Sequence, residues 1–304
     1  MMQRHLALFL ALCLCLGVPA LAEEEAYSFV DDLGRTVQVT RPERVAALTG
    51  SLAELWMLAG GELACATRDA WEEGRLAADS PVVNAGSLKQ PEAETLLQAG
   101  IDFAILTPTL SGQTALGQTL SDAGVTVAFF DMEDFSDYLR ILKICTDITG
   151  DAQAYETYGT KVEAEVAKSV ARAQGQPSPT VLLIRAYSSG VKAKGSADNM
   201  TGAMLRDLGC VNIADSDGGL LEDLSLEAIV AADPDYIFIT TMGADDEALE
   251  QLAGTLESSP AWRGLSAVKA GRSVVLPKNL FHLKPNARWA ESYAILADIL
   301  YGAQ

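Results

Sequence analysis

Short apolar runs alternate with amphipathic segments along most of the chain. Runs bounded by turn residues predict strands at 45–48, 63–66, 103–106, 126–130, 181–184, 236–239 and 274–276. Amphipathic segments predict helices near 52–58, 91–99, 115–123, 199–208, 247–256 and 287–300, with a further helix after Ser225. An alternating stretch at 29–39, centred on 32–34, predicts a hairpin. Strands that alternate with helices of about ten residues favour an α/β fold with mostly parallel sheets.

The middle of the chain departs from this alternation. Residues 135–173 contain little strand character, and valines recur every fourth position at 162, 166 and 170. We interpret this stretch as two helices with a break near Gly150. The second would be roughly 20 residues long and would reach about 30 Å, enough to connect two domains. The turn-rich segment 174–179 marks a boundary.

The amino terminus has the features of a secretory signal peptide. Arg4 and His5 precede an apolar run at 6–18, which is followed by an A-x-A site at 20–22. A buried N-terminal helix is the alternative interpretation. Cys13 and Cys15 follow leucines rather than small residues, which disfavours a lipid anchor. The predicted divisions are therefore a signal peptide (1–22), an N-terminal α/β lobe (23–133), bridging helices (134–176) and a C-terminal α/β lobe (177–304) of an exported protein.

Composition narrows the choice of function. The 304 residues include 41 acids and 22 bases, which give a formal net charge of -19. Such an acidic surface repels nucleic-acid backbones, so we expect no nucleic-acid partner. A hydrophobic share of 49% excludes wholesale disorder, and two His with five Cys argue against a His- or Cys-rich metal cage.

Two segments of the chain echo each other. Residues 94–106 and 227–239 share Glu, Ala and Asp at the same offsets and one apolar pattern, and each predicts a short helix, a tight turn and a strand. Glu94 and Glu227 fall in the first turns of these helices. The helix macrodipole alone explains acids at such positions. The matched occurrence instead favours one exposed carboxylate on each of two similar lobes, which a partner recognises through paired Arg side chains.

Several motifs together resemble one family. The opening D-D-L-G-R-T-V at 31–37, R-P-E-R-V at 41–45, the two echoes, and a C-terminal pattern that starts at Pro260-Ala261-Trp262 resemble the substrate-binding proteins of ABC importers that take up iron-siderophores, haem and vitamin B12. The resemblance implies two Rossmann-like α/β lobes joined by a long bridging helix, with a ligand cleft between the lobes. It also implies that the chain acts as a monomer, and that Glu94 and Glu227 dock onto Arg residues of an ABC permease.

The candidate ligand contacts follow from strand ends. Ligands of open α/β sheets bind beyond the carboxyl ends of the strands. The loops there supply the candidates Ser51, Arg68, Trp71, Thr107, Arg185, Tyr187, Lys192, Thr241, Phe281 and His282. The aromatic members could cover a chelate or pack on their own lobes, and the cations could neutralise an anionic ligand or stay solvated. The basic residues of 278–284 favour an anionic ligand.

His282 is the one His outside the signal peptide. It could ligate a haem iron or serve as an ordinary hydrogen-bonding residue, and alone it cannot build a metal site. The sequence contains no G-x-S-x-G, G-x-x-x-x-G-K-[ST] or G-x-G-x-x-G motif. Its many Asp and Glu residues leave a carboxylate-dependent hydrolase as an alternative, because the number of acids alone does not exclude one. We therefore expect a non-enzymatic protein without an intrinsic cofactor. It would carry a ferric siderophore, with haem and cobalamin as alternatives.

Overall fold

The computed structural model describes residues 26–197, 199–216 and 225–303. The predicted signal peptide, with Cys13 and Cys15, lies outside the described residues. In the part of the chain that is described, no helix combines the length and apolar character needed to cross a membrane. The cysteines there are free, with Cys65 and Cys145 buried and Cys210 half-buried.

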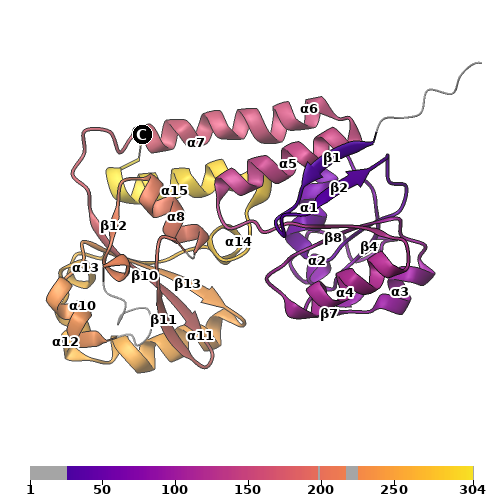
Figure 1. The fold of residues 1–304 in the computed structure, drawn as a ribbon. Coiled ribbons are helices and arrows are strands. Elements are labelled where there is room, and N and C mark those ends of the chain that lie inside the picture. Colours follow the sequence, from indigo (N-terminus) through magenta and orange to yellow (C-terminus); the bar gives the residue numbers. More distant parts are fainter. Residues whose placement is uncertain (1–25, 198, 217–224, 304) are drawn as a thin grey trace, which may run out of the picture.

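The N-terminal lobe begins with a hairpin and continues into a parallel sheet (Figure 1). The hairpin pairs β1 (Tyr27–Val30) with β2 (Thr36–Val39). The sheet has the order β5-β4-β3-β8-β9, with every pair parallel. Its strands are β3 (Val45–Ala47), β4 (Leu63–Ala66), β5 (Val83–Asn84), β8 (Phe103–Leu106) and β9 (Thr126–Phe129). The connecting elements are α1 (Gly50–Leu58), α2 (Asp69–Glu72), β6 (Gly86–Ser87), β7 (Gln90–Pro91), α3 (Ala93–Gln98) and α4 (Ser111–Asp122).

The opening motif has a structural role in this lobe. The Asp31 carboxylate accepts backbone hydrogen bonds from Leu33 and Arg35 within the hairpin turn, and another from Phe129 on β9. It also pairs with the Arg35 guanidinium at 2.6 Å. Asp31 therefore joins the hairpin to the edge of the sheet.

Two helices follow, as the sequence predicts. Helix α5 (Phe135–Thr149) starts at a capping box on Asp134 and ends at Gly150, whose φ of +79° is left-handed. The next helical stretch runs through α6 (Ala152–Tyr155), a π-helical turn (Glu156–Thr160) and α7 (Lys161–Ala171). Figure 1 shows this stretch running above both lobes, so it bridges them.

The C-terminal lobe contains a second, mostly parallel sheet. Its order is β11-β10-β13-β14, with β12 also paired to β10, and only β11 is antiparallel. The strands are β10 (Thr180–Tyr187), β11 (Gly190–Lys194), β12 (Val211–Asn212), β13 (Tyr236–Met242) and β14 (Ser273–Val275). The helices are α8 (Met200–Asp207), α10 (Leu226–Ala232), α11 (Asp245–Leu252), α12 (Pro260–Gly264), α13 (Ser266–Lys269), α14 (Lys278–Phe281) and α15 (Trp289–Tyr301).

The last helix, α15, packs along α7 and joins the bridging layer. Aromatic contacts tie it to α5, with ring centroids 5.5 Å apart for Phe135 and Trp289 and 6.1 Å apart for Phe135 and Tyr293. One hydrophobic cluster extends from the N-terminal sheet through these helices to the C-terminal sheet. The two lobes are thus joined by a shared apolar core, and the lobe boundaries at 133 and 176 stay predictions.

One local prediction was wrong: Pro91 ends strand β7 rather than opening the helix, and α3 starts at Ala93. Two local features lay outside the predictions. Thr49 is the N-cap of α1, because its hydroxyl accepts the hydrogen bond from the Leu52 N–H. The segment after β4 contains the short helix α2.

Candidate functional site

A cavity of about 530 Å³ lies between the lobes. Its volume falls within the range of small-molecule sites in proteins. Residues of both lobes and of the segment after α14 line it: Thr49, Ser51, Leu52, Leu88, Thr107, Thr109, Leu110, Phe130, Asp131, Met132, Glu133, Arg185, Asn199, Met200, His282 and Lys284. The cavity therefore lies beyond the carboxyl ends of parallel strands, where such sheets bind ligands.

Four hydroxyl groups line the N-terminal wall. Thr49 and Ser51 follow β3, and Thr107 and Thr109 follow β8. The Thr49 and Ser51 hydroxyls lie 3.2 Å apart, and those of Thr107 and Thr109 lie 2.9 Å apart. Each pair can donate and accept hydrogen bonds toward a ligand.

A buried glutamine holds the loops of this wall together. Gln113 of α4 is fully buried, and its carbonyl oxygen accepts the Thr107 N–H at 2.9 Å. Its amide nitrogen donates to the Leu48 carbonyl and, at 2.8 Å, to the Leu88 carbonyl. Gln113 was not predicted from the sequence, because nothing in the local pattern separates it from the exposed Gln118 of the same helix.

The loop after β9 contributes both apolar and acidic groups. Phe130 and Met132 are buried, while Asp131 and Glu133 bring carboxylates to the cavity. Burial raises the pKa of Asp131, and the nearby Glu133 raises it further. These four residues were not among the predicted contacts, although the rule that ligands bind beyond strand ends points to them.

Cations line the opposite side. Arg185 comes from β10, and Lys284 lies in the segment between α14 and α15. Burial lowers the pKa of Lys284, and the carboxylates of Asp131 and Glu133 oppose that shift. The charge of Lys284 is thus compensated by acids on the facing loop. Among the described residues, no carboxylate forms a salt bridge with Arg185, and its Nε is buried without a hydrogen-bond partner.

His282 completes this wall as a neutral imidazole. Burial, with the positive charges of Arg185 and Lys278, lowers its pKa to about 4. Its Nδ1 is buried and has no hydrogen-bond partner in the described parts of the chain. Two residues that line the cavity, Arg185 and His282, therefore each contain a buried nitrogen without a hydrogen-bond partner among the described residues.

Comparison with known proteins agrees with this architecture. The family model described as periplasmic binding protein matches residues 45–280, which is most of the chain. This chain belongs to the periplasmic binding protein family. A comparison with curated proteins gives no significant match.

Solved structures of other periplasmic binding proteins share the fold. The siderophore-binding protein BauB, solved with two molecules of acinetobactin and ferric iron, is 19% identical, with a TM-score of 0.72 over 92% of this chain and 99% of that one. The catecholate-siderophore-binding protein VctP of Vibrio cholerae is 16% identical, with a TM-score of 0.71 over 91% and 99% of the two chains. A periplasmic haem-binding protein of Pseudomonas aeruginosa is 26% identical, with a TM-score of 0.68 over 86% and 94%.

Membership of this family settles the general class of the protein. Periplasmic binding proteins are extracytoplasmic, two-lobed, non-enzymatic solute-binding proteins that serve ABC importers. The two-lobed α/β fold and the family resemblance predicted from the sequence are confirmed. The hydrolase alternative is wrong, because members of this family are non-enzymatic substrate-binding proteins.

The periplasmic binding protein brings only part of the predicted contact set to its cavity. Ser51, Thr107, Arg185 and His282 line the cavity. The other predicted contacts are not among the lining residues: Arg68, Trp71, Tyr187, Lys192, Thr241 and Phe281.

Each residue outside the cavity has a clear location. Arg68 is exposed, and the Trp71 ring packs against the main hydrophobic cluster. Thr241 is buried, and its hydroxyl donates to Asp245 at 2.7 Å. Phe281 is fully buried in the core, so its predicted role as a ligand cover does not fit this structure.

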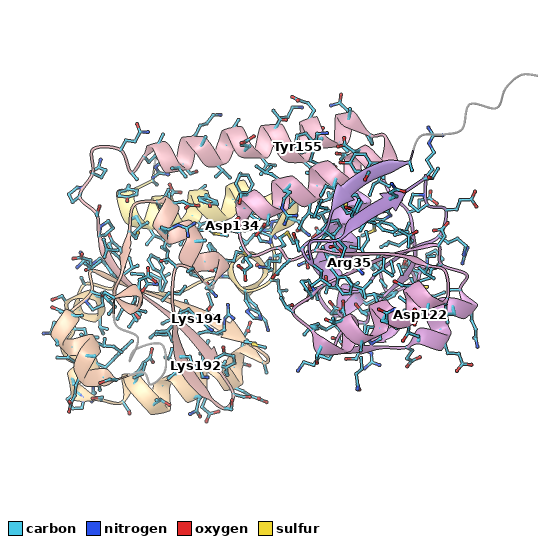
Figure 2. All side chains as sticks on the ribbon, in the orientation of Figure 1. Arg35, Asp122, Asp134, Tyr155, Lys192 and Lys194 are labelled. Atoms are coloured by element: carbon cyan, nitrogen blue, oxygen red, sulfur yellow. The ribbon has the colours of Figure 1, made fainter. Side chains whose placement is uncertain are left out.

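Tyr187 and Lys192 belong to the β10–β11 hairpin, which was not predicted from the sequence. Figure 2 shows Lys192 on the C-terminal lobe. Lys192 is the register partner of Arg185, and cross-strand partners project from the same face of a sheet. It therefore stands beside the cavity cation, although it does not line the cavity.

The two echo segments of this periplasmic binding protein fold alike. Each forms a helix, a left-handed turn and a strand, with Gly100 (φ +66°) and Asp233 (φ +38°) at the same offset. The shared aspartates are structural: Asp102 accepts the Arg44 N–H at 3.0 Å before β3, and Asp235 accepts the Thr180 N–H at 2.8 Å at the start of β10.

The shared glutamates remain at the surface. Glu94 and Glu227 are exposed in the first turns of α3 and α10, which lie on the outer flanks of the two lobes in Figure 1. Three residues further on, Leu97 and Val230 are each 41% exposed. These two lie one helical turn beyond the glutamates and therefore share their helix faces.

Proposed function

We propose that this periplasmic binding protein captures an anionic metal chelate, a ferric siderophore in the first place, and delivers it to an ABC permease. One observation carries the proposal. Arg185 lines a cavity of about 530 Å³, and its guanidinium forms no ion pair with any of the described residues. An anionic ligand in the cavity could accept charge-assisted hydrogen bonds from this guanidinium, and such bonds are roughly twice as strong as those between neutral groups.

The arrangement of charges favours an anionic ligand. Asp131 and Glu133 compensate Lys284, whereas Arg185 has no ion pair among the described residues. The cross-strand pairing of Arg185 with Lys192 places two like charges side by side, which destabilises a sheet unless an anion is present. The serine and threonine hydroxyls of the N-terminal wall suit the oxygen-rich periphery of a siderophore.

Haem is the second candidate, and His282 is the observation that favours it. A pKa of about 4 leaves its imidazole neutral at neutral pH, which is the form that binds iron. The haem-binding protein of Pseudomonas aeruginosa is also similar in sequence, at 26% identity. Phe130 is the only Phe, Tyr or Trp among the lining residues, and its ring is buried, so no exposed ring of these types is left to stack on a macrocycle. This favours the siderophore.

Tryptophan fluorescence titrations with ferric siderophores, haemin and cobalamin test the proposal. We expect saturable binding of a ferric siderophore, and at least about tenfold weaker binding by R185Q, because a charge-assisted hydrogen bond is lost. R263Q makes the same change at an exposed site on α12 and serves as the control. Tight haemin binding that H282Q abolishes would instead select haem, and no response to any of the three would refute the proposal.

We further propose that Glu94 and Glu227 contact the permease. Both are exposed, and each shares its helix face with an equally exposed aliphatic side chain, Leu97 or Val230. Two matched patches, each with one acid and one apolar group, suit a partner with two equivalent subunits that present Arg side chains beside apolar surface.

Uptake into vesicles that contain the cognate permease tests this docking. The double variant E94R/E227R should lose transport while chelate binding stays nearly unchanged. E250R reverses an exposed charge on α11 and should transport normally. Full transport by the double variant would rule out docking through these glutamates.

A further inference from the structure

A polar cluster beside the cavity joins segment 284–286 to the N-terminal lobe. This segment connects α14 with α15 and belongs to the C-terminal part of the chain. The Arg75 guanidinium donates to the Lys284 carbonyl at 2.9 Å. The Asn286 side-chain amide donates to the Ser51 carbonyl at 3.0 Å and to the Glu54 carboxylate at 2.6 Å. Three hydrogen bonds thus cross from this segment to the N-terminal lobe.

Asn286 is built for this contact. It is fully buried, and its φ of +47° is left-handed, a conformation that Asn tolerates better than most residues. A buried side chain on a left-handed backbone holds its conformation only where the surroundings fix it. Here both amide hydrogens are directed to oxygens of helix α1.

An ion-pair network fixes the other half of the cluster. The Arg75 side chain is only 8% exposed, and it pairs with Glu54 and, at 2.6 Å, with Glu73. Glu54 accepts from both Arg75 and Asn286, so it couples the two connections. Charged hydrogen bonds shielded from water are stronger and more directional than exposed ones.

The cluster holds residues that line the cavity. Its anchor points are the backbone of Ser51 on one side and that of Lys284 on the other, and both residues line the cavity. His282 lies two residues before Lys284 on the same segment. Arg185, by contrast, comes from β10, and none of these bonds involves it.

We propose that Asn286, Glu54 and Arg75 are positioning residues that lock the His282–Lys284 segment onto the N-terminal lobe, so that this wall of the ligand cavity is preformed before binding. The ligand then meets a fixed surface made of Ser51, His282 and Lys284, and only the Arg185 wall adjusts to it. A preformed site spares the ligand the entropy of ordering that segment. This positioning role depends on the proposed function only in that the cavity must bind a ligand.

The test needs no ligand, because His282 reports on its own segment. In the full chain with H5Q, one imidazole remains, and its proton NMR signal gives the titration midpoint. With the cluster intact we expect a midpoint near the value of about 4 set by burial and by Arg185, Lys278 and Lys284, against the opposing charge of Asp245. N286G keeps the left-handed backbone accessible and removes the amide, and should move the midpoint toward 6.5.

Two further variants make the result decisive. E54Q keeps an acceptor oxygen but weakens the bonds that Glu54 forms with Arg75 and Asn286. The His282 titration midpoint of this variant should therefore move in the same direction as in N286G. E54Q also provides the test if N286G does not fold. E291Q makes the same change in an exposed pair with Arg288 and should leave the midpoint where it was. Unchanged midpoints in N286G and E54Q, or an equal shift in E291Q, would overturn the proposal. A purely stabilising cluster would lower the melting temperature without moving the midpoint, and failure of the proposed function would appear only in the ligand titrations.

Discussion

Gln113 gives the sharpest prediction about how the cavity is built. Q113L replaces its amide with an apolar side chain of similar size. The change leaves the Thr107 N–H and the carbonyls of Leu48 and Leu88 without their partners. Each buried backbone group left unpaired costs about 1–3 kcal/mol, so loss of the two buried bonds, at the Thr107 N–H and the Leu48 carbonyl, should lower the free energy of unfolding by about 2 kcal/mol or more. The Leu88 carbonyl is only partly buried, so water can replace the bond lost there.

Urea denaturation followed by circular dichroism measures this loss. The matched control is Q118L, the same substitution on the same helix, where the side chain is exposed and its amide contacts Asp122 at 2.8 Å. We expect Q118L to change the free energy of unfolding by less than about 0.5 kcal/mol. Because Gln113 connects the loops that carry the cavity hydroxyls, Q113L should also weaken chelate binding. A Q113L protein as stable as Q118L would refute the reasoning.

Two other predictions concern pH and packing. The pKa of His282 is about 4 in the folded chain against 6.5 ordinarily, so the unfolded chain binds more protons between these pH values and stability falls as the pH drops through them. The loss should reach at most about 3 kcal/mol, and urea titrations should find it in the wild type and not in H282Q. A Cβ on Gly112 would lie 2.0 Å from the Lys89 carbonyl oxygen, whereas one on Gly254 would meet nothing within 4 Å. G112A should therefore lower stability by on the order of 2 kcal/mol, while G254A, in a helical turn, should match or exceed the wild type in thermal melts.

The alternation of apolar runs predicted the fold well, because strand and helix periods are local properties of the sequence. The break at Gly150 was also predictable, since a helix commonly ends at a glycine in the left-handed conformation. The β10–β11 hairpin was missed because its short return strand, Gly190–Lys194, follows a turn without the usual two-residue signature. The single shared core of the bridging layer could not be foreseen, because it depends on α15 packing along α7 over a long sequence separation.

The cavity was harder to predict than the fold. Ser51 and Thr107 could be predicted because they follow strands at the ligand-binding edge, and Arg185 could be predicted because it lies near the carboxyl end of β10. The rule that ligands bind beyond the carboxyl ends of strands does not say which way a side chain points. It therefore also selected Phe281, whose ring is buried in the core. Asn199 and Met200 reach the cavity from the start of α8, where no strand end marks them.

The cluster of Glu54, Arg75 and Asn286 lay beyond any local pattern. Glu54 and Arg75 are 21 residues apart within the N-terminal lobe. Asn286 comes from the C-terminal part of the chain, so its hydrogen bonds to that lobe form only once the two lobes are assembled. From the sequence alone, residues 278–284 were interpreted as a basic region, because the acids that face them come from a distant part of the chain. Asp131 and Glu133 approach Lys284 only in the folded chain.

A ligand-screen thermal shift with the wild type and R185Q tests the central claim most directly. A chelate that binds only the folded protein stabilises it by about 2.7 kcal/mol at a concentration of 100 times the dissociation constant. We predict that a ferric siderophore raises the melting temperature of the wild type and raises that of R185Q far less. If no chelate shifts the wild type, or if both proteins shift equally, the cavity between the lobes is not the binding site.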